Sequence, residues 1–134
     1  MSGPGFRFEA PAGWTVATAK DQATASQGVS LARVTVYPLL KAYAPAKFPA
    51  VTSELDSRVA QLASQLPGGR VVTSATTQVA GMKVRSYRLE FRPGRTEELA
   101  FVLRDRTEYL LLCRRRTSAS DTDCAHFFAS FALR

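Results

Sequence analysis

The sequence contains no apolar run long enough for a transmembrane helix, only two cysteines, and a single histidine among its 134 residues. A helix that crosses a bilayer needs about 20 apolar residues in succession, so none is predicted. The opening stretch "MSGPGFRFEAP" lacks the basic and apolar regions of a signal peptide. We expect residues 1–4 to be linker or added residues, and any native signal or lipid anchor to have been removed.

The shortage of histidine and cysteine argues against most catalytic and metal sites. A structural zinc site needs four ligands, and here Asp121 or Asp123 would have to complete it, so no metal is predicted. His126 follows Cys124 by two residues, a spacing that places them on different faces of a helix. We therefore expect His126 to face solvent, not to act as a general base.

Other catalytic signatures are missing as well. The sequence has no glycine-rich phosphate loop with its lysine and no G-x-S-x-G elbow. Glu97 and Glu98 are adjacent, so they point to opposite faces of a strand and are expected to be exposed hairpin charges. No catalytic residue and no cofactor is predicted.

The composition is that of a globular protein, with 46% apolar residues. A chain of this length fits one domain, expected to span residues 1–134. Seven strands are predicted, at 6–9, 14–19, 29–37, 69–81, 82–91, 96–103 and 108–114. The strands at 29–37 and 108–114 are apolar on both faces, so both are expected to be covered on both sides. Residues 20–28 are predicted to form a polar loop, 41–50 an irregular segment, and 104–107 a turn.

Two helices are predicted from apolar residues at helical spacing. The first covers about 53–66, with Ser53 as N-cap and a buried stripe of Leu55, Val59, Leu62 and Leu66. The second covers about 122–132, with a stripe of Cys124, Phe127, Phe128 and Phe131. The predicted fold class is α+β, a single antiparallel sheet of about six to seven strands with helices packed on its faces.

The two cysteines admit three interpretations. Cys113 lies near the end of a buried strand and Cys124 in the first turn of the following helix, both on core-facing positions, so a structural disulfide is favoured. Such a bridge would place the protein in an oxidising compartment. Two buried free thiols are the first alternative. A redox or nucleophilic pair is the second, although the spacing is wider than C-x-x-C.

Positive charge is concentrated in one part of the chain. The net charge is +7, and residues 83–116 hold ten cations and five anions. One interpretation is a solvated surface, and the other is a surface that faces an anionic lipid or an acidic partner. The residues of that surface would be Arg92, Arg95, Arg104, Arg106, Arg114, Arg115 and Arg116. Nucleic acid is disfavoured as a partner, because the aromatics of 82–91 point away from its arginines.

Three segments resemble the PsbP/Mog1-like superfamily. "FRFEAPAGW" is similar to its F-x-F-x-x-P-x-G-W opening, "VAGMKVRSYRLEF" to its central hairpin, and "FFASFAL" to its closing helix. With "EYLLLCRRR" before a later "C-x-x-F-x-x-S-F", the chain looks most like uncharacterised exported or lipid-anchored actinobacterial members. The resemblance assigns scaffold roles to Phe6, Phe8, Pro11, Gly13, Trp14, Gly81, Tyr87, Ser130 and Phe131.

The resemblance implies an antiparallel sheet between helices and, mostly, binding roles. Members include photosystem accessory subunits, a small-GTPase partner, envelope lipoproteins and secretion chaperones, and they share no catalytic motif. We expect a non-catalytic extracytoplasmic binding or accessory domain, associated with the membrane only through a removed N-terminal signal or anchor. The alternatives are a basic module that docks on anionic lipid or an acidic protein, a small-molecule carrier with an apolar cleft beside residues 41–50, and an enzyme of unrecognised type.

Overall fold

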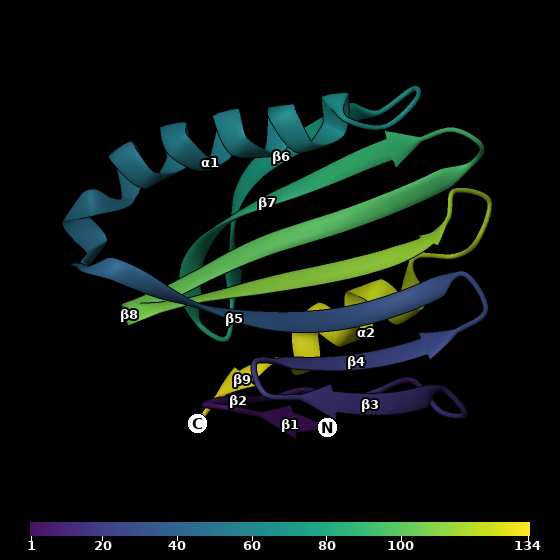
Figure 1. The fold of residues 1–134 in the computed structure, drawn as a ribbon, viewed down its shortest axis with the longest axis horizontal. Helices are drawn as coiled ribbons and strands as arrows, with labels where there is room; N and C mark the ends of the chain where they lie inside the picture. The colour runs from purple at the N-terminus through teal and green to yellow at the C-terminus, as the bar shows by residue number, and fades with distance from the viewer.

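The computed structural model describes all residues 1–134 as two antiparallel sheets and two α-helices (Figure 1). The strands are β1 Ser2–Gly3, β2 Phe6–Arg7, β3 Thr15–Ala19, β4 Gln22–Gln27, β5 Ser30–Tyr43, β6 Arg70–Val79, β7 Met82–Phe91, β8 Arg95–Arg116 and β9 Ala132–Leu133. The helices are a 3-10 turn at Pro45–Lys47, α1 Phe48–Ser64 and α2 Thr122–Ser130. The large sheet has the order β3-β4-β5-β8-β7-β6, and the small sheet has the order β1-β2-β9. No helix combines the length and the apolarity that crossing a bilayer requires.

Strand β8 folds back on itself into two legs (Figure 1). The hydroxyl oxygens of Thr96 and Thr117 lie 2.7 Å apart, whereas a straight strand of this length would separate its ends by about 70 Å. Asp105, with φ of 53°, lies where the chain reverses. The first leg pairs with β7 and the second with β5. The reversal confirms the turn predicted at 104–107.

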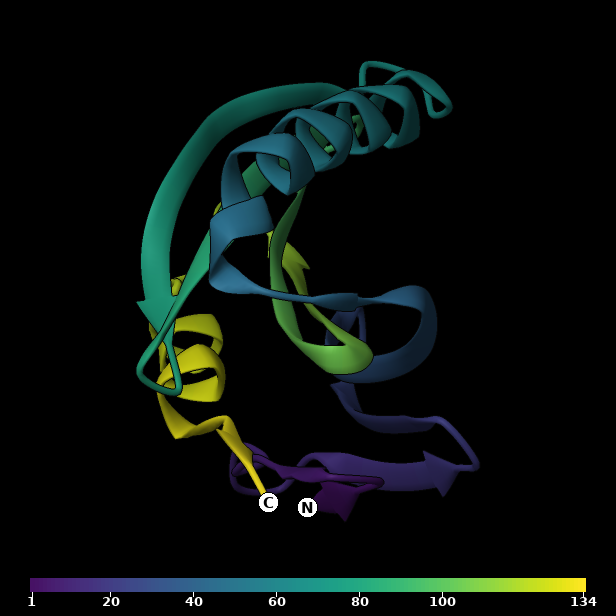
Figure 2. The same ribbon diagram turned by 90° about the vertical axis from the view of Figure 1, so that its left-hand side faces the viewer.

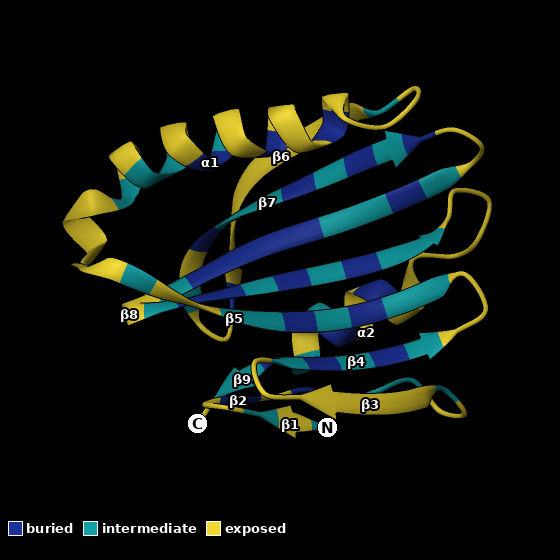
Figure 3. Cartoon of the chain, viewed as in Figure 1, coloured by how far each residue is buried: buried dark blue, intermediate teal, exposed yellow.

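The large sheet has a hydrophobic core on each face. Helix α1 covers the face that carries Tyr87, Leu89 and Phe91. Helix α2 covers the other face, where its Phe127 packs among side chains of β4, β5 and β8. Figure 2 shows the two helices on opposite sides of the curved sheet, and Figure 3 shows buried residues alternating along the central strands. The predicted α+β class with helices on both faces is confirmed.

The prediction of a single sheet is wrong, because the chain ends form a second one. Phe6 pairs with Leu133, a contact between residues too far apart in sequence for a local pattern to indicate. Phe6 is fully buried and its ring lies 6.1 Å from that of Phe131. The small sheet therefore holds both termini together beside the core (Figure 1).

Residues 20–28 were predicted as a loop, and this is also wrong. They contain β4, whose Ala23 and Ala25 are fully buried and alternate with polar residues. Alanine is small and carries a weak apolar signal, so the composition of the segment looked like that of a loop.

Helix α1 begins earlier than predicted, at Phe48, with Pro49 in its first turn. Proline is well tolerated there because its missing N–H has no helical partner in any case. Ser53 is therefore inside the helix and is not its N-cap. Leu62 and Leu66 are 43% and 45% exposed, so the predicted stripe is buried only in its first half.

Candidate functional site

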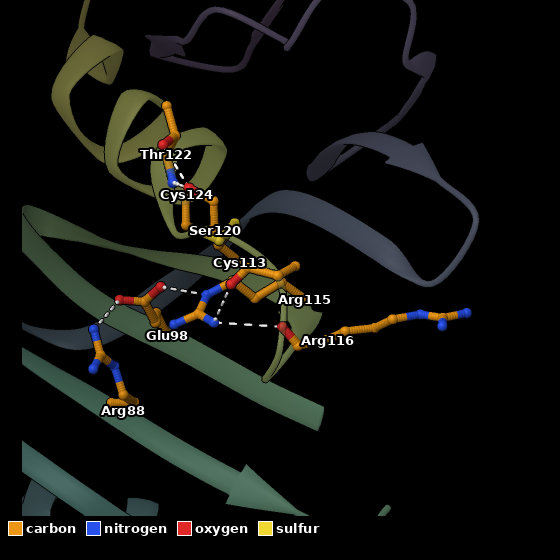
Figure 4. The surroundings of a disulfide bond; sticks show 9 residues. Arg88, Glu98, Cys113, Arg115, Arg116, Ser120, Thr122 and Cys124 are labelled. Atoms are coloured by element: carbon orange, nitrogen blue, oxygen red, sulfur yellow. Dashed lines mark hydrogen bonds and ion pairs between the residues drawn. A yellow bond between two sulfur atoms is a disulfide. The ribbon is translucent and has the colours of Figure 1, made fainter. Parts of the chain in front are cut away.

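Cys113 and Cys124 form a disulfide, as the sequence predicts. Their sulfur atoms lie 2.10 Å apart and their Cα atoms 5.6 Å apart. Both residues are buried, at 0% and 2% exposure. The bond fastens the start of α2 to the second leg of β8 (Figure 4). At that helix start the Ser120 hydroxyl accepts a hydrogen bond from the Thr122 amide at 3.1 Å, which satisfies one of the free N–H groups of the first turn.

Arg115 organises the loop that the disulfide closes. Its Nε donates to Glu98 at 3.5 Å, and its Nη1 reaches the carbonyl oxygens of Arg116, Thr117 and Ala119 at 3.2–3.4 Å. The side chain is only 11% exposed. Arg115 therefore has a structural role in addition to its charge.

The seven arginines of the predicted anion-facing surface lie in two places. The first group, called here the basic end, lies at the β7–β8 hairpin and the end of β8 and consists of Arg92, Arg95, Arg114, Arg115 and Arg116. The second group lies where β8 folds back. There Arg104 donates to the Arg134 carbonyl and Arg106 to the Leu40 carbonyl, each at 3.2 Å.

Acidic side chains partly neutralise the basic end. Glu97 accepts from Arg114 at 2.9 Å and lies 3.5 Å from Arg95. Glu98 pairs with Arg115. Both carboxylates are mostly buried, at 13% and 19% side-chain exposure, so the prediction that they are exposed is wrong. They are buried because two antiparallel legs of β8 bring arginines across from them.

Arg92 and Arg116 are the two arginines of the basic end that are exposed and have no carboxylate partner. The side chain of Arg116 makes no hydrogen bond, and its backbone carbonyl accepts from Nη1 of Arg115 and from the Ala119 amide. The stem of Arg92 lies against Gly68, where an added Cβ would come within 2.4 Å of it. These two guanidinium groups remain available to an external anion.

An apolar cleft opens between α1 and the end of β5. It encloses about 420 Å³, which is within the range of small-molecule sites. Leu39, Tyr43 and Val51 are among its apolar lining residues, and Leu40 beside them is 96% exposed. Burial raises the pKa of the Tyr43 phenol. Residues 41–50, beside which an apolar cleft was the expected mark of a carrier, form one wall.

An ion pair divides this cleft from a second hollow of about 400 Å³. Nη2 of Arg58 donates to both carboxylate oxygens of Glu108 at 3.1 Å. The Arg58 guanidinium also lies 4.8 Å from the centre of the Phe101 ring. The side chain of Glu108 is 8% exposed and that of Arg58 is 48% exposed. The Glu108 carboxylate therefore forms the floor of the cleft, whereas the Arg58 guanidinium remains partly open to both hollows.

Helix α1 is also held to the sheet by Asp56. Its Oδ1 accepts from the Tyr87 hydroxyl at 2.5 Å and from Nη2 of Arg85 at 3.0 Å. The hydrogen bond from Tyr87 holds the pKa of Asp56 below its usual value, assisted by Arg85. Burial, followed by the bond to Asp56, raises the pKa of Tyr87 to about 12.

Sequence reasoning missed Arg58 and Glu108 as site residues. One signal was present, because Glu108 is in step with Leu110 and Leu112 and therefore on an apolar face of its strand, where both leucines are partly buried. The face of His126 was predicted correctly: its side chain is 53% exposed and its Nε2 lies 3.5 Å from Glu9.

No protein-family model matches the chain, and no curated protein sequence matches it. Solved structures do. A protein from Bacteroides thetaiotaomicron aligns with a TM-score of 0.63 and 10% identity over 96% of this chain and 45% of its own. Cyanobacterial PsbP (CyanoP) from Synechocystis sp. PCC 6803 aligns with a TM-score of 0.69 and 11% identity over 97% and 87%. LpqN, involved in cell envelope biogenesis of Mycobacterium tuberculosis, aligns with a TM-score of 0.62 and 12% identity over 97% and 85%.

The chain thus spans less than half of the first of these proteins and most of the other two. At such low identity the likeness concerns the fold. The chain has a PsbP/Mog1-like fold, as the sequence resemblance predicts.

Proposed function

We propose that this chain is an extracytoplasmic, envelope-associated binding domain that performs no chemistry of its own. The Cys113–Cys124 disulfide carries the proposal, because disulfides persist in oxidising compartments and are rare in the reducing cytosol. The structural likeness to LpqN, a protein involved in cell envelope biogenesis of Mycobacterium tuberculosis, supports the same compartment.

The positions of the ionisable side chains favour binding over catalysis. Glu97 and Glu98 are occupied by arginines, and Asp56 by Tyr87 and Arg85. His126 is exposed beside Glu9. The groups that general acid–base chemistry would use are thus engaged in holding the fold or lie on the surface.

The thiol state of protein isolated from its native cells tests the compartment. Rapid alkylation before lysis, followed by intact-mass measurement with and without reductant, should give an unmodified chain two hydrogens lighter than the dithiol. Reduction should then expose two alkylatable cysteines. The variant Cys113→Ala is the matched control, because it leaves Cys124 as a free thiol that should be alkylated once when the chain is denatured in the reagent. Two thiols alkylated in the untreated wild type would overturn the proposal.

The cleft beside residues 41–50 favours a second candidate, a carrier of a small apolar molecule. Its lining is mainly apolar with a few charged groups at the edge and floor, the usual make-up of a ligand site. The substitution Val51→Trp should fill it and abolish binding of an environment-sensitive apolar dye. Val16→Trp, on the exposed edge strand β3 where Val16 is 53% exposed, should leave dye binding unchanged. Equal binding by both variants would rule the carrier out.

A further inference from the structure

Three loops meet at the basic end. The Thr117 amide donates to the Gly94 carbonyl at 2.7 Å, and the Arg92 amide donates to the Pro67 carbonyl at 3.3 Å. These bonds tie the segment after α1, the β7–β8 hairpin and the segment after β8 into one surface. Figure 1 shows all three at the same end of the large sheet, with the turn between β4 and β5 beside them.

A hollow of about 540 Å³ at this end has no acidic side chain in its lining. Three arginines line it, Arg95, Arg115 and Arg116, together with Val29, Pro93, Gly94 and Ser118. Arg92, unpaired and exposed, precedes Pro93 in the same β7–β8 hairpin, and its stem lies against Gly68 of the segment after α1. Glu97 and Glu98 pair with Arg95, Arg114 and Arg115 and so reduce the charge of the basic end, which stays positive.

Exposed apolar side chains flank these arginines. Val29 lines the same hollow and is 52% exposed, and Leu66, beside Pro67, is 45% exposed. A surface with guanidinium groups around protruding apolar side chains suits a bilayer interface, where the cations contact headgroup phosphates and the apolar groups enter the acyl boundary. A nucleic-acid platform would instead need exposed aromatic rings, and Phe91 here is buried beneath Arg95.

We propose that the basic end docks the domain on an anionic lipid leaflet. This inference rests on the proposed function, because an envelope-associated domain has such a leaflet within reach. It places the contact at Arg92, Arg116 and Val29, and it leaves the arginines at the fold-back of β8 outside the contact.

The test is sedimentation of the intact protein with vesicles of phosphatidylcholine alone or with added phosphatidylglycerol, at low and high salt. Binding should require the anionic lipid and weaken with salt. One arginine near an anionic surface contributes about fivefold in affinity. The double variant Arg92→Glu/Arg116→Glu should therefore bind at least about 25-fold more weakly.

The matched control is Arg104→Glu/Arg106→Glu, which changes the net charge equally. These two arginines lie at the fold-back of β8 and bind only backbone carbonyls. This variant should keep wild-type binding within about twofold, since remote charges are screened. If both pairs reduce binding equally, net charge alone is responsible and the proposal fails.

Two further variants separate loss of contact from loss of fold. Arg92→Lys/Arg116→Lys keeps the charges and should retain binding, while circular dichroism verifies that the glutamate variant is folded. Val29→Ser should remove the part of the binding that persists at high salt. Absence of binding to anionic vesicles would overturn the proposal, as would equally tight binding to a soluble polyphosphate with no contribution from Val29. Since vesicle binding is measured in vitro, its failure is distinguishable from a failure of the thiol test of compartment.

Discussion

The Tyr87 hydroxyl on β7 donates a hydrogen bond of 2.5 Å to Oδ1 of Asp56 on α1 and so pins the helix to the sheet. Tyr87 is 4% exposed, and its ring also packs edge-on against Phe101 at 5.9 Å. The bond joins a charged acceptor to a nearly buried donor, an arrangement stronger than that between two neutral groups.

Removal of this hydroxyl should destabilise the fold. Tyr87→Phe keeps the ring but loses the bond to Asp56, so urea unfolding should show a loss of about 1–2 kcal/mol. Tyr109→Phe is the control, because Tyr109 is equally buried and its hydroxyl makes no hydrogen bond within the protein. An equal loss in both variants would mean that the bond to Asp56 contributes nothing specific.

Low pH should weaken the hydrogen bond between Tyr87 and Asp56. The pKa of Asp56 is lower in the folded protein than in the unfolded chain, where it is about 3.9. The carboxylate therefore contributes its full stabilisation above the unfolded value and loses it as the pH falls through the folded value. Thermal melts from neutral pH down to about pH 2.5 should show the difference between wild type and Asp56→Asn shrinking below about pH 4.

Glu54→Gln provides the reference for that titration. Glu54 lies on the same helix but has no ion pair or hydrogen bond. Its difference from wild type should stay small, because the substitution removes no contact. If the difference in melting temperature between wild type and Asp56→Asn is undiminished at the lowest pH, the stabilising role of the Asp56 carboxylate is contradicted.

Loss of the disulfide should lower the free energy of unfolding more than loss of the Tyr87–Asp56 hydrogen bond. The bond closes a loop between residues 11 positions apart, for which chain-entropy estimates give about 2–3 kcal/mol. Cys113→Ala/Cys124→Ala should unfold at correspondingly lower urea than oxidised wild type. Wild type with reductant is the comparison, and its stability should fall by a similar amount. No difference between oxidised and reduced wild type would show that the bond does not stabilise the fold.

Substitutions in the Arg58–Glu108 ion pair, at the floor of the cleft, should change the free energy of unfolding non-additively. Arg58→Met leaves the buried Glu108 carboxylate without its partner, at a cost of about 2 kcal/mol. The double variant Arg58→Met/Glu108→Gln removes the unpaired charge and should recover part of that loss. A double-mutant cycle in urea measures the coupling, and strictly additive losses would indicate that solvent replaces Arg58 without cost.

Local patterns predicted the parts of the fold that are built from neighbouring residues. The alternation of 82–91 correctly identified Tyr87, Leu89 and Phe91 as one buried face. The helical spacing from Cys124 to Phe131, read together with the predicted strand that contains Cys113, predicted the pairing of the cysteines. In each case a few adjacent residues carry the whole signal.

Contacts between distant segments were not predictable in this way. Strand β4 was missed because its buried residues are alanines, and the small sheet was missed because Phe6 and Leu133 meet only after folding. Arg58 and Glu108 lie 50 positions apart on different elements. For the basic end, the sequence showed which residues are arginines, but the division into two groups depends on where β8 reverses.

The small sheet also determines how the protein unfolds. It joins residues 2–7 to 132–133, so the loop it closes is almost the entire chain and its closure entropy is correspondingly large. Strands of two residues could not hold such a loop by backbone bonds alone. What secures it is Phe6 and Phe8, at 0% and 2% exposure, packed in the same core as Phe127 and Phe131. The ends are therefore expected to come free together with the core, in one cooperative step, instead of fraying ahead of it.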